Sequence, residues 1–126
     1  MSTSIQYFGE ICIKRFMELE ENLYKNPSGF TDYIAGIQET VNNLGIKVIE
    51  ETLEAMDEMI CKSPKRKKHW HVEAHEQKDL LTPLGKVTFS KTLYAHKQNR
   101  TSEGKQEMCY LLDKALGFTE NERMTD

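Results

Sequence analysis

The sequence has few cysteines and no long apolar run, and both absences narrow the class of protein. Cys12, Cys61 and Cys109 are far apart and form no Cys-x-x-Cys pair. A disulfide framework and a four-cysteine zinc site are therefore disfavoured, and we expect reduced thiols. No stretch approaches the roughly 18 apolar residues that cross a bilayer, and the N-terminus lacks the pattern of a secretory signal. We therefore expect a cytoplasmic chain with no membrane partner.

Motifs for catalysis and cofactor binding are also missing. The sequence has no glycine-rich phosphate loop, no Gly-x-Ser-x-Gly elbow and no His-Glu-x-x-His helix. His69, His71 and His75 would share one face of an extended strand, which makes a metal site conceivable. Neighbouring lysines oppose a bound cation, however, and no fourth ligand is evident. We therefore expect no metal, no cofactor, no small-molecule ligand, no catalytic residue and no enzyme activity in this chain.

Charge is distributed unevenly along the sequence. The 126 residues carry a net charge of −3, yet residues 62–100 hold ten basic and three acidic side chains, which gives this stretch a net charge of +7. Residues 1–61 hold four basic and eleven acidic side chains, a net charge of −7. The two blocks could neutralise each other within one molecule, or the basic block could bind a polyanion.

Residues 1–61 are typical of a hairpin of two helices. Apolar side chains recur every three or four residues over 4–24, which indicates an amphipathic helix, and Asn-Pro-Ser-Gly at 26–29 ends it. A second, long helix is predicted over 32–61, with a kink or break near Gly45, because glycine weakens a helix. The short connection favours antiparallel packing. Such a pair leaves apolar surface that the sheet, another protomer or a missing segment must cover.

The stretch 69–94 is predicted to form a β-hairpin. Thr82-Pro83-Leu84-Gly85 has the composition of a tight turn, with proline at the second position and a glycine that tolerates positive φ. Before the turn, Trp70, Val72 and Ala74 would share one face of a strand. After it, two sets alternate between the faces of a second strand: Val87, Phe89, Lys91 and Leu93 on one face, and Thr88, Ser90, Thr92 and Tyr94 on the other.

The rest of the chain is predicted to form an exposed loop over 97–106, a third strand over 108–112 and one helical turn over 113–116. Thr119 and Glu122 have the spacing of a capping box, which predicts the start of another helix.

The predicted fold class is α+β. It consists of an N-terminal antiparallel helix pair with a long second helix, a three-stranded antiparallel β-meander and a short C-terminal helix. We expect a helical hairpin of residues 1–61, followed by one module of residues 62–126 made of a basic linker, the meander and a truncated helix.

Positive charge is densest where the second helix gives way to the sheet. Residues 62–71 hold five positive charges and no acid, with Trp70 among them. Such side chains neutralise phosphates and release counterions, and an exposed tryptophan can stack on a base. Alternatively, Trp70 anchors the core of the hairpin and the basic stretch is a solvated linker. The candidate DNA-binding residues are Lys65, Arg66, Lys67, Lys68, Trp70, Lys86 and Lys91.

Three short motifs follow one another in the second half of the chain: Thr-x-x-Gly-x-Val-x-Phe-Ser at 82–90, Leu-Leu-Asp at 111–113 and Glu-Arg-Met-Thr at 122–125. In this order they are the most specific part of a resemblance that spans residues 29–126. The chain resembles the N-terminal region of a family of bacterial insertion-sequence transposases that was long catalogued as an uncharacterised protein family. At Lys91 the family tends to have arginine, whose bidentate fork lysine lacks.

The resemblance implies that such a region precedes an RNase H-like catalytic domain whose acidic residues hold two metal ions, and that none of that domain is in this chain. It also implies that the region itself contacts transposon-end DNA or helps the protein to dimerise.

We therefore predict an N-terminal fragment of a transposase, a DNA-binding or assembly module that is not catalytic by itself. The alternative is a protein-interaction or dimerisation module that pairs its apolar helix stripe with a second copy and does not bind DNA.

Overall fold

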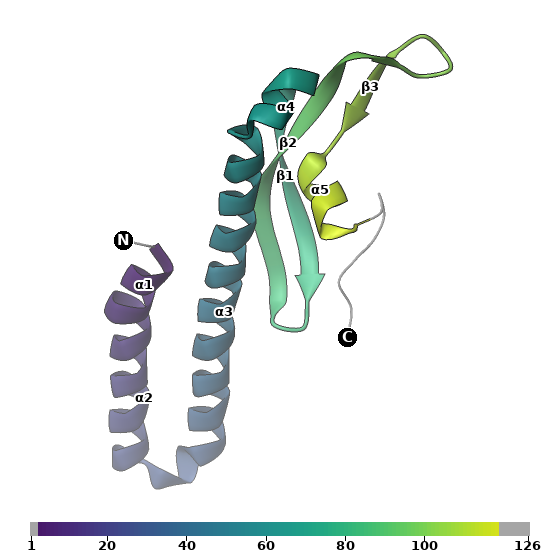
Figure 1. Ribbon diagram of the computed structural model, residues 1–126. Helices are drawn as coiled ribbons and strands as arrows, with labels where there is room; N and C mark the ends of the chain where they lie inside the picture. Colours follow the sequence, from purple (N-terminus) through teal and green to yellow (C-terminus); the bar gives the residue numbers. More distant parts are fainter. Residues whose placement is uncertain (1–2, 119–126) are drawn as a thin grey trace. The chain divides into compact units, whose positions relative to one another are not determined.

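The computed structural model describes residues 3–118, which fall into two units (Figure 1). The helical unit is Met1–Glu51 and the sheet unit is Thr52–Asp126. The predicted α+β fold is confirmed, because helices are followed by a three-stranded antiparallel sheet and a short helix. The capping box expected at Thr119 and Glu122 lies outside the described residues. None of the helices within 3–118 is both long and apolar enough to cross a membrane.

The first helical segment is interrupted by a π-helix, which the sequence pattern did not indicate. α1 (Thr3–Tyr7) leads into the π-helix Phe8–Cys12, and α2 (Ile13–Lys25) continues from it. A π turn contains more residues than an α turn, so it rotates the apolar positions before it relative to those after it. The expected continuous stripe is accordingly split. Cys12 is fully buried, whereas Phe8 is 44% exposed.

A single long helix follows a short 3-10 turn, Pro27–Gly29. α3 (Phe30–Cys61) is continuous for 32 residues, so the break predicted near Gly45 is wrong. An isolated glycine costs only about 1 kcal/mol relative to alanine, and the many other helical residues outweigh that cost.

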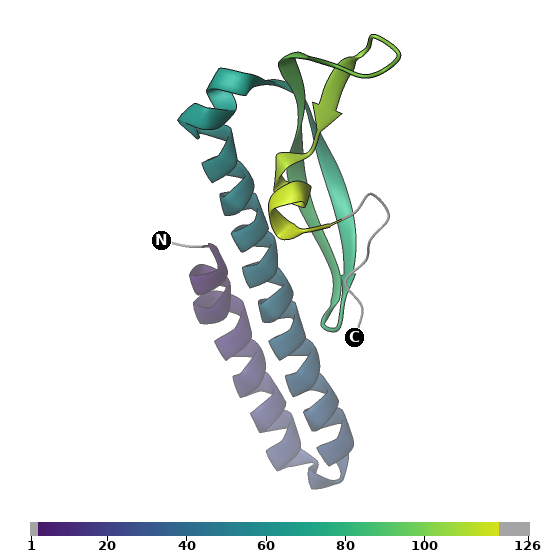
Figure 2. The same cartoon turned by 45° about the vertical axis from the view of Figure 1, so that its right-hand side comes forward.

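α2 and α3 lie side by side (Figure 2), and they approach most closely where a glycine of α3 meets a leucine of α2. A Cβ atom at Gly36 would lie 2.6 Å from Cδ2 of Leu19, so glycine allows the two helices to approach closely. Thr40 is buried one turn later, and its hydroxyl donates a hydrogen bond of 2.8 Å to the Gly36 carbonyl. The sequence pattern predicts an apolar stripe on this helix made of Ile34, Ile37, Val41, Leu44 and Val48. The side of α3 that faces α2 is therefore not centred on that stripe.

The predicted hairpin is present. β1 (Trp70–Thr82) and β2 (Gly85–Arg100) pair around Pro83 and Leu84, and Gly85 has a φ of 136°, which favours glycine. The Thr82 hydroxyl donates to the Gly85 carbonyl at 2.8 Å and accepts the Leu84 N–H at 3.2 Å. These bonds fix the turn, and the turn fixes the register of the strands.

The third strand and the last helix begin earlier than the sequence predicted. β3 (Gln106–Cys109) pairs with β2, and α5 (Leu111–Leu116) starts where the strand was expected to continue. β2 itself extends to Arg100, through the first part of the expected loop. The meander topology is as predicted, with strand order β1-β2-β3.

A β-bulge at Glu73 changes which residues of β1 share a face. Ala74 lies opposite Leu93, but Val72 lies opposite Tyr94, so β1 has one residue more than β2 at this point. Partners across an antiparallel pair point to the same face of the sheet. Val72 therefore lies on the face opposite to that of Ala74, and the prediction that they share a face is wrong.

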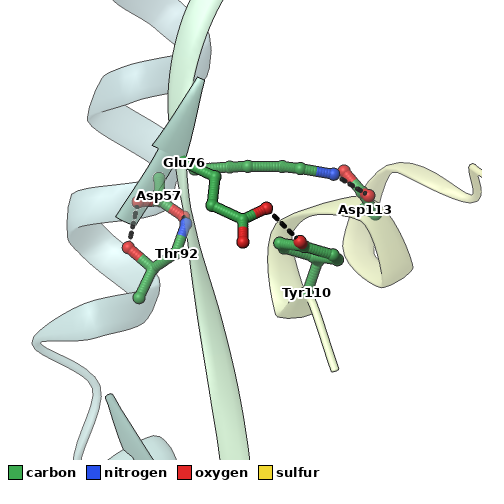
Figure 3. Close-up of polar contacts among 6 residues, drawn as sticks. Asp57, Glu76, Thr92, Tyr110 and Asp113 are labelled. Carbon is green, nitrogen blue, oxygen red and sulfur yellow. Dashed lines mark hydrogen bonds and ion pairs between the residues drawn. The ribbon is translucent and has the colours of Figure 1, made fainter. Parts of the chain in front are cut away.

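Two carboxylates of α3 cover the open edge of β2. The N–H of Ser90 donates to Glu54 at 3.0 Å. Thr92 donates to Asp57 through its N–H at 3.2 Å and its hydroxyl at 2.7 Å (Figure 3). β3 pairs with β2 only from Tyr94 onward. Without the two carboxylates, these strand N–H groups would lack partners at an edge. The last turns of α3 are thus fastened to the sheet by charge-assisted hydrogen bonds, of which the two between Thr92 and Asp57 are buried.

Candidate nucleic-acid interface

The predicted basic linker is a short helix, α4 (Pro64–His69). Ser63 is extended, with φ −65° and ψ 133°, and Pro64 occupies the first turn, where its missing N–H costs nothing. The helix gives the basic side chains a defined direction, which a linker would not provide.

Arg66 points inward from α4 and is used within the fold. Its Nε donates to the Cys61 carbonyl at 2.8 Å, and Nη1 donates to the Trp70 carbonyl at 3.3 Å. Its guanidinium carbon also lies 5.6 Å from the ring centroid of the buried Tyr94. Because the last carbonyls of a helix lack intrahelical partners, Arg66 satisfies the end of α3 and joins it to β1.

The three lysines of α4 point outward. At 100° per residue, Lys65, Lys67 and Lys68 lie on the half of the helix opposite Arg66, and all three are exposed. The register of the hairpin places Trp70 opposite His96, which brings Lys97 to α4, where its ammonium donates to the Lys67 carbonyl. We call Lys65, Lys67, Lys68 and Lys97 the basic end.

Trp70 lies at the base of this surface. It is half-buried, and its ring packs edge-on against His96 with 4.7 Å between centroids. His96 in turn stacks on His69 at 6.1 Å. These contacts hold α4 against the sheet and leave only part of the indole ring available to a ligand.

Two of the sequence-predicted lysines lie elsewhere. Lys86 is exposed beside the turn, 3.8 Å from Asp79. The hairpin spans twelve residue steps from Trp70 to Thr82, so Lys86 is roughly 40 Å from the basic end at about 3.3 Å per residue. Lys91 is only 6% exposed, so the expectation that it contacts phosphates does not fit its position.

Lys91 belongs to a polar cluster on the α5 side of the sheet. Its Nζ donates to Oδ2 of Asp113 at 2.6 Å and lies 3.7 Å from the ring centroid of Tyr110. The Tyr110 hydroxyl donates to Glu76 (Figure 3). The cluster borders an open hollow of about 710 Å³. The opposite charges of Lys91 and Asp113 are paired with each other, which indicates that the cluster has a structural role in holding α5 to the hairpin.

The histidines do not gather as the strand alternation suggested. His69 lies in α4, and the bulge places His71 opposite Ala95 and His75 opposite Thr92, on different faces of the sheet. Within residues 3–118, no group of three or more histidine, cysteine, aspartate or glutamate side chains is placed to hold a metal ion.

Tyr94, whose ring lies against Arg66, is buried in the sheet unit. Burial raises the pKa of Tyr94 to about 12, and the nearby Cys61 and Asp57 act in the same direction. Among the described residues, the buried Tyr94 hydroxyl has no hydrogen-bond partner. The phenol therefore stays neutral, and its ring packs against the guanidinium group of Arg66.

Sequence reasoning missed Lys97, Asp57 and Asp113. Lys97 could have been found by counting the hairpin register back from the turn, because strand residues equidistant from a turn face each other. Asp113 had a weaker signal, since Lys91 alternates with Phe89 and Leu93 and a lysine on an apolar face requires a partner. Asp57 looked like any other acid of an acidic helix, and nothing in its spacing set it apart.

Comparison with known proteins identifies relatives but no solved structure. Residues 23–126 match the uncharacterised protein family UPF0236. One UPF0236 protein of Caldanaerobacter subterraneus subsp. tengcongensis is 32% identical over 111 residues, which cover 88% of this chain and 22% of the relative. Another from the same organism is 31% identical over 108 residues, or 86% of this chain and 22% of the relative. No solved structure matches.

The chain spans about a fifth of the length of these curated relatives. The family match covers most of the chain, including α4, the whole hairpin and α5. The chain therefore belongs to the uncharacterised protein family UPF0236.

Proposed function

We propose that this chain binds DNA through the basic end, as the DNA-binding or assembly module of a cytoplasmic transposase that moves an insertion sequence, and that it is not catalytic by itself. The observation that carries the proposal is the outward row of Lys65, Lys67 and Lys68 on α4. None of the three forms an ion pair with another described residue, unlike Lys62, Lys86 and Lys91. Unpaired lysines on a rigid helix neutralise phosphates at little cost in desolvation or ordering.

The relatives support the mobile-element part of the proposal. The name of one UPF0236 relative joins eleven locus numbers of a single organism, and that of another joins four. Many loci for one protein within one genome are typical of an element that copies itself. The proposal assigns the DNA-cleaving domain to the part of the longer relatives that this chain does not span.

The test is fluorescence anisotropy with a labelled 30-base-pair duplex taken from the end of an insertion sequence that encodes a longer relative. A scrambled duplex serves as the second probe. We expect wild-type protein to bind at low salt, and the triple variant Lys65→Gln, Lys67→Gln, Lys68→Gln to bind at least tenfold more weakly.

The matched control removes the same charge from exposed positions of the helical unit, as Lys14→Gln, Arg15→Gln, Lys25→Gln. It should bind within about twofold of wild type. Absence of wild-type binding to both duplexes at low salt would refute the proposal, and so would equal losses in the two triple variants.

The second candidate function is a protein-interaction module without DNA binding. It is favoured by large apolar side chains that lie exposed on the helical unit, such as Met17 at 61% and Ile34 at 47%. The anisotropy experiment separates the two, because a pure interaction module would bind neither duplex.

A further inference from the structure

Large apolar side chains are exposed along both helices of the helical unit. On α2, Ile13 is 42% exposed, Met17 61% and Tyr24 71%. On α3, Phe30 is 57% exposed, Ile34 47% and Val41 51%. We call these six residues the apolar side. The exposure does not arise from loose packing of the pair, since Cys12, Leu19 and Thr40 are buried between the helices.

Helical geometry places all six residues on the same side of the pair. On α2, Ile13, Met17 and Tyr24 lie roughly 130° further round the helix than the buried Cys12 and Leu19, at about 100° per residue. On α3, the exposed residues lie roughly 120° further round, in the same sense, than Gly36 and Thr40, which face α2. Because the helices run antiparallel, equal rotations about their own axes bring the two stripes to one side.

On α3 the surface beside the stripe carries little charge, whereas on α2 Glu20 borders the stripe and accepts a hydrogen bond of 3.0 Å from the Tyr24 hydroxyl. Between Asp32 and Lys47, Glu39 is the one charged residue, and its helical position is on the far side of α3 from Ile34 and Val41. Solvated helices usually carry charged residues opposite their apolar stripe and along its borders. Here the residues next to the stripe are Thr31, Gln38 and Gly45, which are uncharged.

The exposed area is of the size that a pair of copies needs. Taken together, the exposed fractions amount to about 600–700 Å² of mostly apolar surface per chain, close to the roughly 800 Å² that each partner contributes to a stable interface. A two-fold axis brings the same side of two copies together, so each copy would cover the apolar side of the other. Two such pairs would bury their stripes in the centre of a four-helix bundle.

We propose that the apolar side binds a second copy of this chain, so that the helical units form a two-fold symmetric four-helix bundle. Because Leu19 lies level with Gly36 in the antiparallel pair, Met17 and Ile34 of each copy lie near the middle of the bundle. Tyr24 and Phe30 lie toward the end near the 27–29 turn, and Ile13 and Val41 toward the other end. This inference does not rest on DNA binding. It assigns assembly to the helical unit, whereas the basic end belongs to the sheet unit.

The experiment measures the mass of the full chain by analytical ultracentrifugation from about 1 to 200 µM. Wild-type protein should sediment as a dimer, with twice the chain mass of 14.7 kDa, at the upper concentrations. The variant Ile34→Lys, Val41→Lys should weaken association at least 100-fold and sediment as a monomer. Circular dichroism at 222 nm should show its helices retained, because both positions are about half exposed.

The matched control adds the same two lysines to exposed positions on the rest of α3, as Ala35→Lys, Asn43→Lys, and should remain a dimer. A second test on the other helix, Met17→Lys, should weaken association as well; it decides the question if the α3 variant loses helix. A wild-type monomer at 200 µM would overturn the proposal and assign the apolar side to another protein or to a further segment of a longer chain. A dimer unaffected by both variants, or a trimer or larger assembly, would also overturn it.

Discussion

The ion pair between Lys91 and Asp113 offers a sharp test of the structural reasoning, because sequence pattern alone gave Lys91 a different role. The Lys91 side chain is 7% exposed and that of Asp113 is 17% exposed. Lys91→Met would leave a largely buried carboxylate whose other oxygen, Oδ1, already lacks a hydrogen-bond partner among the described residues. Breaking a buried pair costs about 3–5 kcal/mol. Loss of the cation–π contact with Tyr110 adds about 1 kcal/mol.

Removing both charges should cost much less than removing one. The free energy of unfolding of the double variant Lys91→Met, Asp113→Leu should lie within about 1–2 kcal/mol of the wild-type value, because neither charge is then left buried without a partner. The coupling energy between the two positions should therefore be at least about 2 kcal/mol. Lys86→Met, at an exposed position of the same strand, is the control and should change stability by less than about 0.5 kcal/mol.

The assay is urea unfolding followed by the fluorescence of Trp70, the one tryptophan of the chain, which lies in the sheet unit. The assignment of Lys91 to a buried ion pair with Asp113 would be refuted if the unfolding free energy of Lys91→Met were within about 1 kcal/mol of the wild-type value. A coupling energy near zero would refute it as well. DNA affinity gives a second reading, since Lys91→Met protein that remains folded should bind DNA as wild type does. Loss of affinity without loss of stability would instead restore Lys91 as a phosphate contact.

Three further predictions concern other contacts. Asp57→Ala should lower the unfolding free energy of the sheet unit by about 2–4 kcal/mol in urea titrations, because two hydrogen-bond donors of Thr92 lose a charged acceptor; Thr92→Val in that background should then cost little. Tyr94→Phe should be neutral or stabilising, because it removes a buried hydroxyl without a partner. The pKa of Tyr94 in the folded protein, about 12, is above its ordinary value of 10.0. The contribution of the neutral Tyr94 phenol to stability is therefore fully present below pH 10, and wild type should lose about 1.4 kcal/mol per pH unit as the pH rises from 10 toward 12. Thermal melts of Tyr94→Phe should not show this loss. Gly36→Leu should destabilise the helical unit by at least about 2 kcal/mol in far-ultraviolet melts, because the new side chain would occupy the space of Leu19; an unchanged melt would contradict the close helix contact.

Features that depend on local chemistry could be predicted from the sequence. The turn at 82–85 follows from proline and glycine at positions that require them, and its bonds to Thr82 are those that such a turn forms. The long α3 follows from helical periodicity, although glycine was given too much weight as a breaker. The order of strands follows from short connections between them.

Features that depend on packing could not be predicted. The π-helix at Phe8–Cys12 and the bulge at Glu73 each add one residue, and period counting alone carries no information about an insertion. The apolar stripe of α3 was found, but the helix turns a side containing Gly36 toward α2 instead, because close contact there requires a residue without a side chain.

The candidate interface was predicted only in part, because the direction of each basic side chain also depends on packing. The position of the basic cluster along the chain was found, but not which cations point outward. Arg66 and Lys91 have the same charge as Lys65 and Lys68, and only the structure shows that the first two are used within the fold. A chain of mixed charge can therefore indicate a nucleic-acid interface without indicating its residues.

The most direct test of the proposed DNA binding is the dependence of affinity on salt. If Lys65, Lys67, Lys68 and Lys97 each neutralise one phosphate, log K should fall with log salt concentration at a slope of about −3.6. The variant Lys65→Gln, Lys67→Gln, Lys68→Gln should reduce the slope to about −1. A wild-type slope near zero, or a slope of about −3.6 that survives removal of the three lysines, would contradict the account.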